Sequence, residues 1–125
     1  MSARKENSTN NINRKILSDT CGLMYALEII GGRWKMLILY KLEARRLRFS
    51  ELKKRLPNIT SRMLTLHLKE LEHAHLIKRH VYPEVPVRVE YELATAALTL
   101  SPMWHLLKTW GDDHKELYGS LLETA

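Results

Sequence analysis

The chain has little cysteine and lacks long apolar runs and internal repeats, and each shortage excludes a class of protein. Its single cysteine, Cys21, rules out a disulfide within the chain and favours a reducing compartment. The longest apolar stretch, residues 36–40, is far shorter than a membrane span. Residues 1–15 contain no apolar core of the kind found in secretory signals. We therefore expect a cytoplasmic protein with no membrane association.

Catalytic and metal-binding patterns are also missing from the sequence. It contains no glycine-rich phosphate loop, nucleophile elbow or paired-carboxylate motif. Its six histidines show no zinc-ligand spacing with one another or with Cys21. His73 and His75 could belong to a site completed in space, but the exposed end of a helix is the better interpretation. We expect no enzyme activity, no metal and no cofactor.

Length and apolar content predict one domain. The chain has 125 residues, of which 45% are hydrophobic, enough for a single core. Residues 1–13 are polar and rich in asparagine, and we expect them to form a disordered arm. The remaining residues, 14–125, would form the folded domain.

Charge is distributed unevenly. Residues 33–79 carry thirteen Lys and Arg against four Asp and Glu, whereas residues 80–125 carry three against seven. The formal net charge of the whole chain is +6. This asymmetry favours a basic face for a polyanion and a separate acidic end, although charged side chains can also serve only to solvate helices.

The first half of the sequence predicts four helices. Thr20 would cap the first, Gly31-Gly32 would end it, and a second would follow from about Arg33. Residues 47–49 would form a short strand or link. Ser50 would then cap a helix running to about residue 56, before Pro57. The fourth helix would begin with Thr60 or Ser61 as its cap. Its apolar side chains at helical spacing would face the core: Leu64, Leu68 and Leu71.

A two-stranded ribbon and a long helix are expected next. Residues 77–82 and 87–93 have strand character, and Pro83 and Pro86 stiffen the loop between them. The last helix would begin after about Leu98. Its apolar seam repeats in steps of four and three: Met103, Leu107, Trp110, His114, Leu117 and Leu121. With Leu23 and Leu27 of the first helix, this seam predicts a homodimer interface; the alternative is a helix folded onto its own core.

A helix that fits a groove, followed by a hairpin that can lie beside it, is typical of a winged helix-turn-helix. The predicted fold class is mainly α with a small β-hairpin wing, and its expected partner is double-stranded DNA. Arg62 could pair with guanine, and Thr65 and Leu66 could contact base edges or methyl groups. Candidate phosphate contacts are Ser61, Lys69, Arg48, Lys53 and Lys54. Arg88 would either contact DNA or form an ion pair with Glu84 or Glu90.

Cys21 has two interpretations. At the start of a helix, free backbone amides can stabilise its thiolate and make it sensitive to oxidants. Most unpaired cysteines are instead small buried hydrophobic residues.

Several segments, in the same order and at consistent spacing along the chain, resemble the HxlR family. Its members are winged-helix transcriptional regulators related in architecture to the MarR group. The resemblance starts at Cys21 and continues through residues 27–34, 48–52, 59–64, 68–72 and 82–91. It implies a homodimer joined through the first and last helices, a major-groove helix from Thr60, and, in some members, an electrophile or oxidant sensor at the position of Cys21. The chain departs from the family at Gly22, Ala94 and Ala97, and Thr95 is then the expected cap of the last helix.

We therefore predict a sequence-specific transcriptional regulator that binds an inverted-repeat operator as a dimer. It would be redox- or electrophile-responsive if Cys21 is a sensor. The alternative is a winged-helix protein-interaction module whose basic face binds another acidic partner. The sequence identifies neither the operator nor a small-molecule effector.

Overall fold

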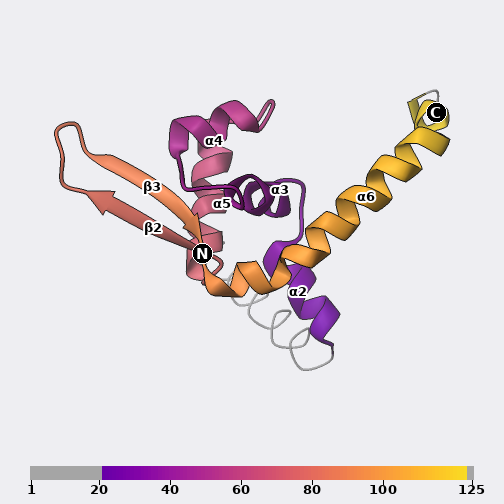
Figure 1. Cartoon of the computed structure of the whole chain (residues 1–125), viewed down its shortest axis with the longest axis horizontal. Helices are drawn as coiled ribbons and strands as arrows, with labels where there is room; N and C mark the ends of the chain where they lie inside the picture. The colour runs from indigo at the N-terminus through magenta and orange to yellow at the C-terminus, as the bar shows by residue number, and fades with distance from the viewer. Residues whose placement is uncertain (1–20, 124–125) are drawn as a thin grey trace, which may run out of the picture.

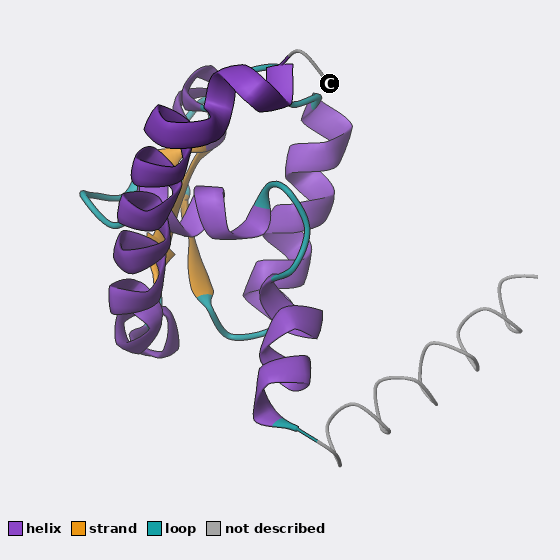
Figure 2. Ribbon diagram, turned by 90° about the vertical axis from the view of Figure 1, so that its right-hand side faces the viewer, coloured by secondary structure: helices purple, strands orange, loops and turns teal. Residues whose placement is uncertain are grey.

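A cluster of short helices carries a projecting hairpin on one side and a long helical arm on the other (Figure 1). The structure is a computed structural model, and it describes residues 21–123. The elements run in this order: α2 (Gly22–Ile30), α3 (Lys35–Leu42), β1 (Leu47–Arg48), α4 (Phe49–Arg55), α5 (Ser61–His73), β2 (Ile77–Tyr82), β3 (Arg88–Leu93) and α6 (Thr95–Glu123). Helices dominate this part of the chain, as Figure 2 shows in the perpendicular view. The expected disordered arm, residues 1–13, lies outside the described residues.

The core lies where α3, α4, α5 and the base of the sheet meet. Leu64, Leu68 and Leu71 are buried, which confirms the predicted inward stripe of α5. They pack in one cluster with apolar residues of the neighbouring elements, among them Ile38, Leu39, Leu47, Leu52, Leu56, Ile77 and Trp104. Leu64, Leu68 and Leu71 thus form a buried ridge along α5. Burial of this ridge determines which side of α5 faces outward, because residues about half a turn away must point to solvent.

The hairpin belongs to a three-stranded antiparallel sheet. The strand order is β1-β3-β2, so β3 is the central strand. Leu47 pairs with Tyr91 and Arg48 with Glu90, while β2 pairs with β3 from Ile77–Leu93 out to Tyr82–Arg88. The short strand before α4 and the ribbon are therefore confirmed. The predicted return strand is one residue too long at its start, because Val87 lies in the exposed tip.

Thr60 sets the start of α5. Its hydroxyl oxygen accepts a hydrogen bond from the Met63 amide at 3.1 Å, so Thr60 rather than Ser61 is the cap. The turn before it contains Asn58 with a φ of 67°, a left-handed conformation that asparagine tolerates better than most residues. The α4–turn–α5 unit thus has defined ends, and α5 has a fixed rotation relative to the core.

Several predicted helix boundaries are wrong. The second helix begins at Lys35 rather than Arg33, because Gly31 and Gly32 are followed by two further residues of turn. Arg48, not Ser50, occupies the cap position of α4, and its amide donates to the Glu51 carboxylate at 2.9 Å.

The two outer helices also differ from expectation. Cys21 is the N-cap residue of α2, and Thr20, the predicted cap, lies outside the described residues. The last helix begins at Thr95, earlier than expected, so Thr95 is its first residue rather than its cap. Ala94, beside β3, accepts the first hydrogen bonds of this helix, from the amides of Ala97 and Leu98. No helix of the described chain is long and apolar enough to cross a membrane.

Candidate nucleic-acid interface

The outward face of α5 presents the side chains predicted to contact DNA. Arg62, Thr65, Leu66 and Lys69 are exposed, and Ser61 is exposed at the start of the helix. The Thr65 hydroxyl donates to the Ser61 carbonyl at 2.8 Å. This bond occupies the hydroxyl proton, so Thr65 offers its methyl group and an acceptor oxygen to an incoming base edge.

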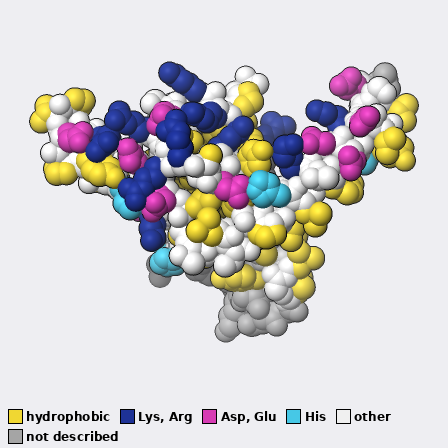
Figure 3. Space-filling view, in the orientation of Figure 1, with side chains coloured by type: hydrophobic (Ala, Val, Ile, Leu, Met, Phe, Trp, Pro, Cys, Tyr) yellow, Lys and Arg dark blue, Asp and Glu magenta, His cyan; other side chains and the backbone are white. Residues whose placement is uncertain are grey.

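Further basic side chains are exposed on the two elements that precede α5 in the chain. Arg48, Lys53 and Lys54 are exposed on β1 and α4, as predicted. Figure 3 shows Lys and Arg over the helical body and the base of the hairpin, whereas hydrophobic and acidic side chains cover much of the α6 arm. Within residues 21–123, no ion pair neutralises Arg62, Lys53 or Lys54. Their positive charge is therefore available to phosphates.

Arg88 occupies a different environment from these cations. Its guanidinium lies 3.1 Å from Glu84 and 3.4 Å from Glu90, and it stacks over the Tyr82 ring at 4.0 Å. The structure thus shows the ion pairs that were the alternative to a DNA contact. The hairpin tip beyond Arg88 is apolar, with Val85 and Val87 exposed.

Arg46, which the sequence analysis missed, ties the hairpin to the helical body. It lies in the turn between α3 and β1, and its Nε donates to Glu92 on β3 at 2.8 Å. Its Nη1 donates to the Tyr82 hydroxyl on β2 at 2.9 Å, and His80 also contacts Glu92, at 3.2 Å. Arg46 and then His80 lower the pKa of the Glu92 carboxyl, while Glu92 raises the pKa of Arg46. A loop arginine gives no sequence signal of such a contact between distant segments.

Arg79 is a second residue that the sequence analysis missed. It lies on β2 and lines a cleft of about 340 Å³ between α5 and the sheet, together with Thr65, Lys69 and Tyr91. Lys78 and Arg79 are both exposed on β2. Because successive strand residues point to opposite faces, their charge in the sequence could not show which of the two lies beside α5.

Cys21 is exposed at the N-terminus of α2. Its side chain makes no cap hydrogen bond, but the nearby backbone amides, Met24 first and then Leu23, lower the pKa of its thiol. The interpretation of Cys21 as a buried hydrophobic residue is therefore wrong, and its surroundings are those that favour a thiolate.

The predicted dimer seam is open to solvent in the single chain. The exposed fraction is 62% for Trp110 and 70% for Leu117, and the other apolar members are also exposed: Leu23, Leu27, Met103, Leu107 and Leu121. His114 is half-buried because its ring stacks between Trp110 and Tyr118, with centroids 4.9 and 5.0 Å away. Helix α6 therefore does not pack these side chains against the core of the same chain, which was the alternative to a dimer interface. No group of three or more metal-ligating side chains occurs among the described residues.

The model of the HxlR-like helix-turn-helix family matches residues 29–118, most of the chain. The chain belongs to this family. A helix-turn-helix transcriptional regulator of Methanothermobacter thermautotrophicus is 47% identical over 105 residues, covering 84% of this chain and 77% of that protein. The regulator YdeP of Bacillus subtilis is 46% identical over 96 residues, with 77% and 75% covered.

Solved structures agree with this assignment. The redox regulator HypR in its reduced form is 38% identical with a TM-score of 0.76, covering 80% of this chain and 99% of that chain. The transcriptional regulator ytcD is 43% identical with a TM-score of 0.74, covering 78% and 99%. These likenesses confirm the winged-helix fold class. This HxlR-type protein is a transcriptional regulator and not an enzyme.

Arg46→Met removes the link between the helical body and the hairpin. We expect the pKa of Glu92 to rise towards its ordinary value in this variant, and backbone amides of β2 and β3 to exchange faster with solvent. Because the folded-state pKa of Glu92 is depressed, the Arg46–Glu92 pair stabilises the fold above the ordinary glutamate pKa and loses its effect as pH falls through the folded pKa. The stability difference between the two proteins should therefore vanish in acid.

Carboxylate NMR titration and hydrogen exchange measure these effects. Arg45→Met is the matched control, because Arg45 pairs with Glu51 on α4 and does not touch the hairpin. An unchanged Glu92 titration in Arg46→Met would contradict the assignment.

Proposed function

We propose that this regulator binds an inverted-repeat operator as a homodimer, with α5 of each subunit in a major groove and the hairpin alongside. The observation that carries the proposal is the exposed α5 face with Arg62, Thr65 and Leu66, together with the exposed, uncompensated Lys53 and Lys54 on α4, the helix before it in the chain. An α-helix fits the major groove, where each base pair presents a distinct set of donors, acceptors and methyl groups. A regulator acting on the chromosome belongs in the cytoplasm.

The side chains would have separate roles. Arg62 has five donors in a planar fork and would pair with a guanine, while Leu66 and the Thr65 methyl would contact thymine methyl groups. Lys69, Arg48, Lys53 and Lys54 would contact phosphates, and Ser61 would do so together with the α5 N-terminus. Arg79 joins this set because it lines the same cleft as Thr65 and Lys69. Arg88, with its two carboxylate partners, would instead keep the hairpin rigid.

The α6 arm supports the homodimer. A monomer rarely exposes a contiguous apolar surface as long as this seam. A second copy would cover it around a two-fold axis, together with Leu23 and Leu27 of α2. Two symmetric subunits would then read half-sites about one helical turn apart.

Cys21 would make the regulator sensitive to oxidants. Two solved relatives are the redox regulator HypR in its oxidised and reduced forms. Cys21 itself is exposed, and its pKa is lowered. Because the chain has one cysteine, its disulfide would join two chains or attach a small thiol.

Arg62→Ala should weaken operator binding by about 1–3 kcal/mol and relax the preference at one base pair. Arg62→Lys should recover the phosphate attraction but not the preference, since lysine lacks the planar fork. Fluorescence anisotropy with an operator selected from random duplexes measures both effects. Lys115→Ala, on the far arm, is the control and should bind as the wild type does. Equal losses on every duplex would show that Arg62 contacts only phosphate, and no preference in the wild type would refute specific recognition.

Leu117→Glu should dissociate the dimer, because it places a charge in the middle of the apolar seam. Analytical ultracentrifugation should show monomers at concentrations where the wild type is dimeric. Thr109→Glu introduces the same charge on α6 outside the seam and should leave the dimer intact. A wild-type monomer, or a dimer that Leu117→Glu does not affect, would refute this interface.

Cys21→Ser should abolish any effect of diamide on operator affinity, while leaving affinity without oxidant unchanged. In the wild type, alkylation of Cys21 by iodoacetamide should accelerate at lower pH than that of a free cysteine, because its pKa is lowered. Mass spectrometry follows the alkylation. Operator binding that diamide does not alter in the wild type would leave Cys21 without a sensing role.

A further inference from the structure

The last helix leaves the helical body at Trp104. Ala97 and Trp104 are its buried residues, and past Trp104 no described residue of α6 is buried. The helix continues to Glu123 as the arm that carries most of the proposed seam (Figure 1). With a rise of about 1.5 Å per residue, this arm is roughly 30 Å long, so a small change of direction at its base is amplified at its far end.

The backbone of α6 does not by itself fix the direction of the arm. Pro102 lies inside the helix, just before Trp104. A proline inside a helix lacks the amide that would bond to the carbonyl four residues earlier, and helices bend or kink at such positions. The direction of the arm past Pro102 therefore depends on side-chain contacts with the body.

Glu43 provides these contacts from the end of α3, where it is the C-cap residue. Its Oε1 lies 2.6 Å from Nε2 of His105 and accepts a hydrogen bond from Nε1 of Trp104 at 3.4 Å. The His105 ring also meets the ring of Tyr40 on α3 edge-on, with centroids 5.8 Å apart. One carboxylate thus holds both residues at the base of the arm.

Helix α3 itself gives no reason for an acidic residue at this position. The last carbonyls of a helix carry partial negative charge, which repels a carboxylate. Contacts with Trp104 and His105 offset this repulsion. We therefore attribute the carboxylate of Glu43 to the base of the arm and not to the stability of α3.

The turn that contains Glu43 also holds elements proposed to meet DNA. Residues 43–46 connect α3 to β1. Arg45 pairs with Glu51 of α4 at 3.1 Å, and Arg46 donates to Glu92 of the hairpin at 2.8 Å. The arm is therefore fixed to the same short segment as α4 and the hairpin.

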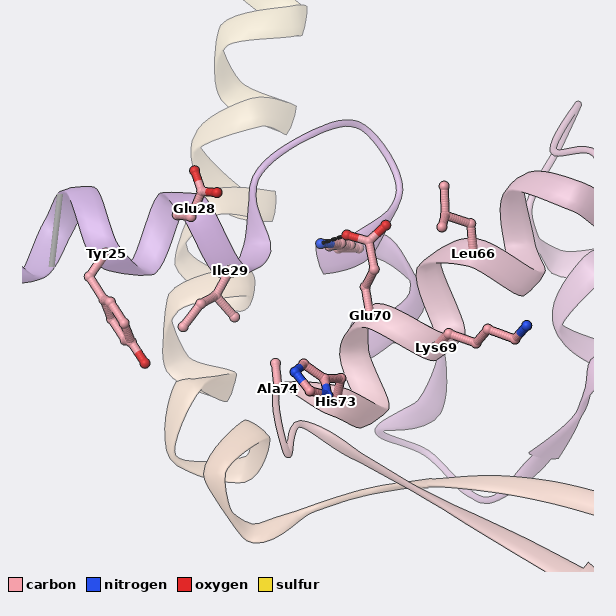
Figure 4. Close-up of a pocket in the computed structure, with 9 residues that line it drawn as sticks. Tyr25, Glu28, Ile29, Leu66, Lys69, Glu70, His73 and Ala74 are labelled. Carbon is pink, nitrogen blue, oxygen red and sulfur yellow. Dashed lines mark hydrogen bonds and ion pairs between the residues drawn. The ribbon is translucent and has the colours of Figure 1, made fainter. Parts of the chain in front are cut away.

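Helix α2, which carries the rest of the proposed seam, is less closely packed. Ile30 is the only buried residue of α2 in the described chain. A cavity of about 500 Å³ separates α2 from α5, and Figure 4 shows Tyr25, Glu28 and Ile29 on the α2 side of it. The close packing that links the seam to the DNA-facing elements therefore runs through α6 and Glu43.

We propose that Glu43 is a positioning residue that fixes the angle of the arm, and thereby the spacing of operator half-sites that the dimer accepts. The spacing rests on the proposed function. A tilt of about 10° at the base of the arm would move its far end by about 5 Å, more than the rise of one base pair, about 3.4 Å. A partner bound along the arm would move with it, together with its own α5. A fixed arm therefore selects one spacing, whereas a loose arm accepts several.

Operators of altered spacing test the proposal. The selected operator is rebuilt with up to two base pairs added to or removed from its centre, and fluorescence anisotropy measures binding of the full chain to each duplex. The wild type should bind the best spacing about tenfold more tightly than one changed by two base pairs. Glu43→Ala should reduce this ratio to about twofold, while its affinity for a single half-site stays at the wild-type value because the face of α5 is unchanged.

Glu116→Ala, on the exposed arm outside the seam, is the matched control and should keep the wild-type ratio. His105→Ala should reduce the ratio as Glu43→Ala does, and the double variant should be no worse than Glu43→Ala, because both side chains act through one contact. If Glu43→Ala does not fold by circular dichroism, His105→Ala decides, since the His105 side chain is 51% exposed. An unchanged ratio, equal losses on the single half-site and the full operator, or additive losses in the double variant would overturn the proposal.

Pulsed electron paramagnetic resonance separates failure of this proposal from failure of the proposed function. A nitroxide at Arg62→Cys, in the Cys21→Ser background, reports the distance between the two α5 helices of the dimer without DNA. We expect one narrow distance distribution, and Glu43→Ala should widen it at least twofold. An equally narrow distribution in Glu43→Ala would overturn the role of Glu43 and leave the homodimer intact. Absence of any distance between labels with Glu43 in place would refute the homodimer, and the role of Glu43 in spacing with it.

Discussion

The structure depends on the burial of one ridge of α5. Leu64, Leu68 and Leu71 are fixed in the core, and the Lys35–Glu70 pair holds the adjoining flank against α3. Burial of a lysine is costly without such a partner, so this pair also resists rotation of the helix. Because the ridge cannot turn, the residues about half a turn away form a face of fixed composition. The regulator therefore has a rigid surface on which specific recognition can be built.

Compensation of charge separates two kinds of basic residue. Arg46 and Arg88 are held by carboxylates and tyrosine in and around the hairpin, where they fix one segment against another. Arg62, Lys53 and Lys54 have no such partners in the described chain, so their charges create a field at the surface. Amino-acid composition gives each of these five residues the same positive charge and does not distinguish them. The first two hold segments of the fold together, and the remaining three are those proposed to contact DNA.

Helix α2 carries three features of the structure. Cys21 is its N-cap residue. One side of the helix carries Leu23 and Leu27 of the proposed seam, and the other side lines the cavity beside α5. A modification at its N-terminus would act on this short element. It ends at Gly31, where a Cβ would lie 2.3 Å from the Leu27 carbonyl oxygen, so this junction requires glycine. A shift of α2 can thus reach both the subunit interface and the DNA-facing helix.

Local pattern was enough to predict the order of elements, the inward ridge of α5, the ribbon and the exposed seam, because helical and strand periodicities are properties of neighbouring residues. Helix starts at Lys35, Phe49 and Thr95 were mispredicted, since several residues nearby could cap each one and tertiary packing selects among them. The roles of Arg46 and Arg88 and the Lys35–Glu70 pair depend on contacts between segments distant in sequence or across the hairpin tip. The cavity between α2 and α5 likewise exists because helices that are distant in sequence lie near each other. Sequence by itself determined which faces exist, whereas the tertiary structure decided which charges are compensated, because compensation requires two side chains to meet in space.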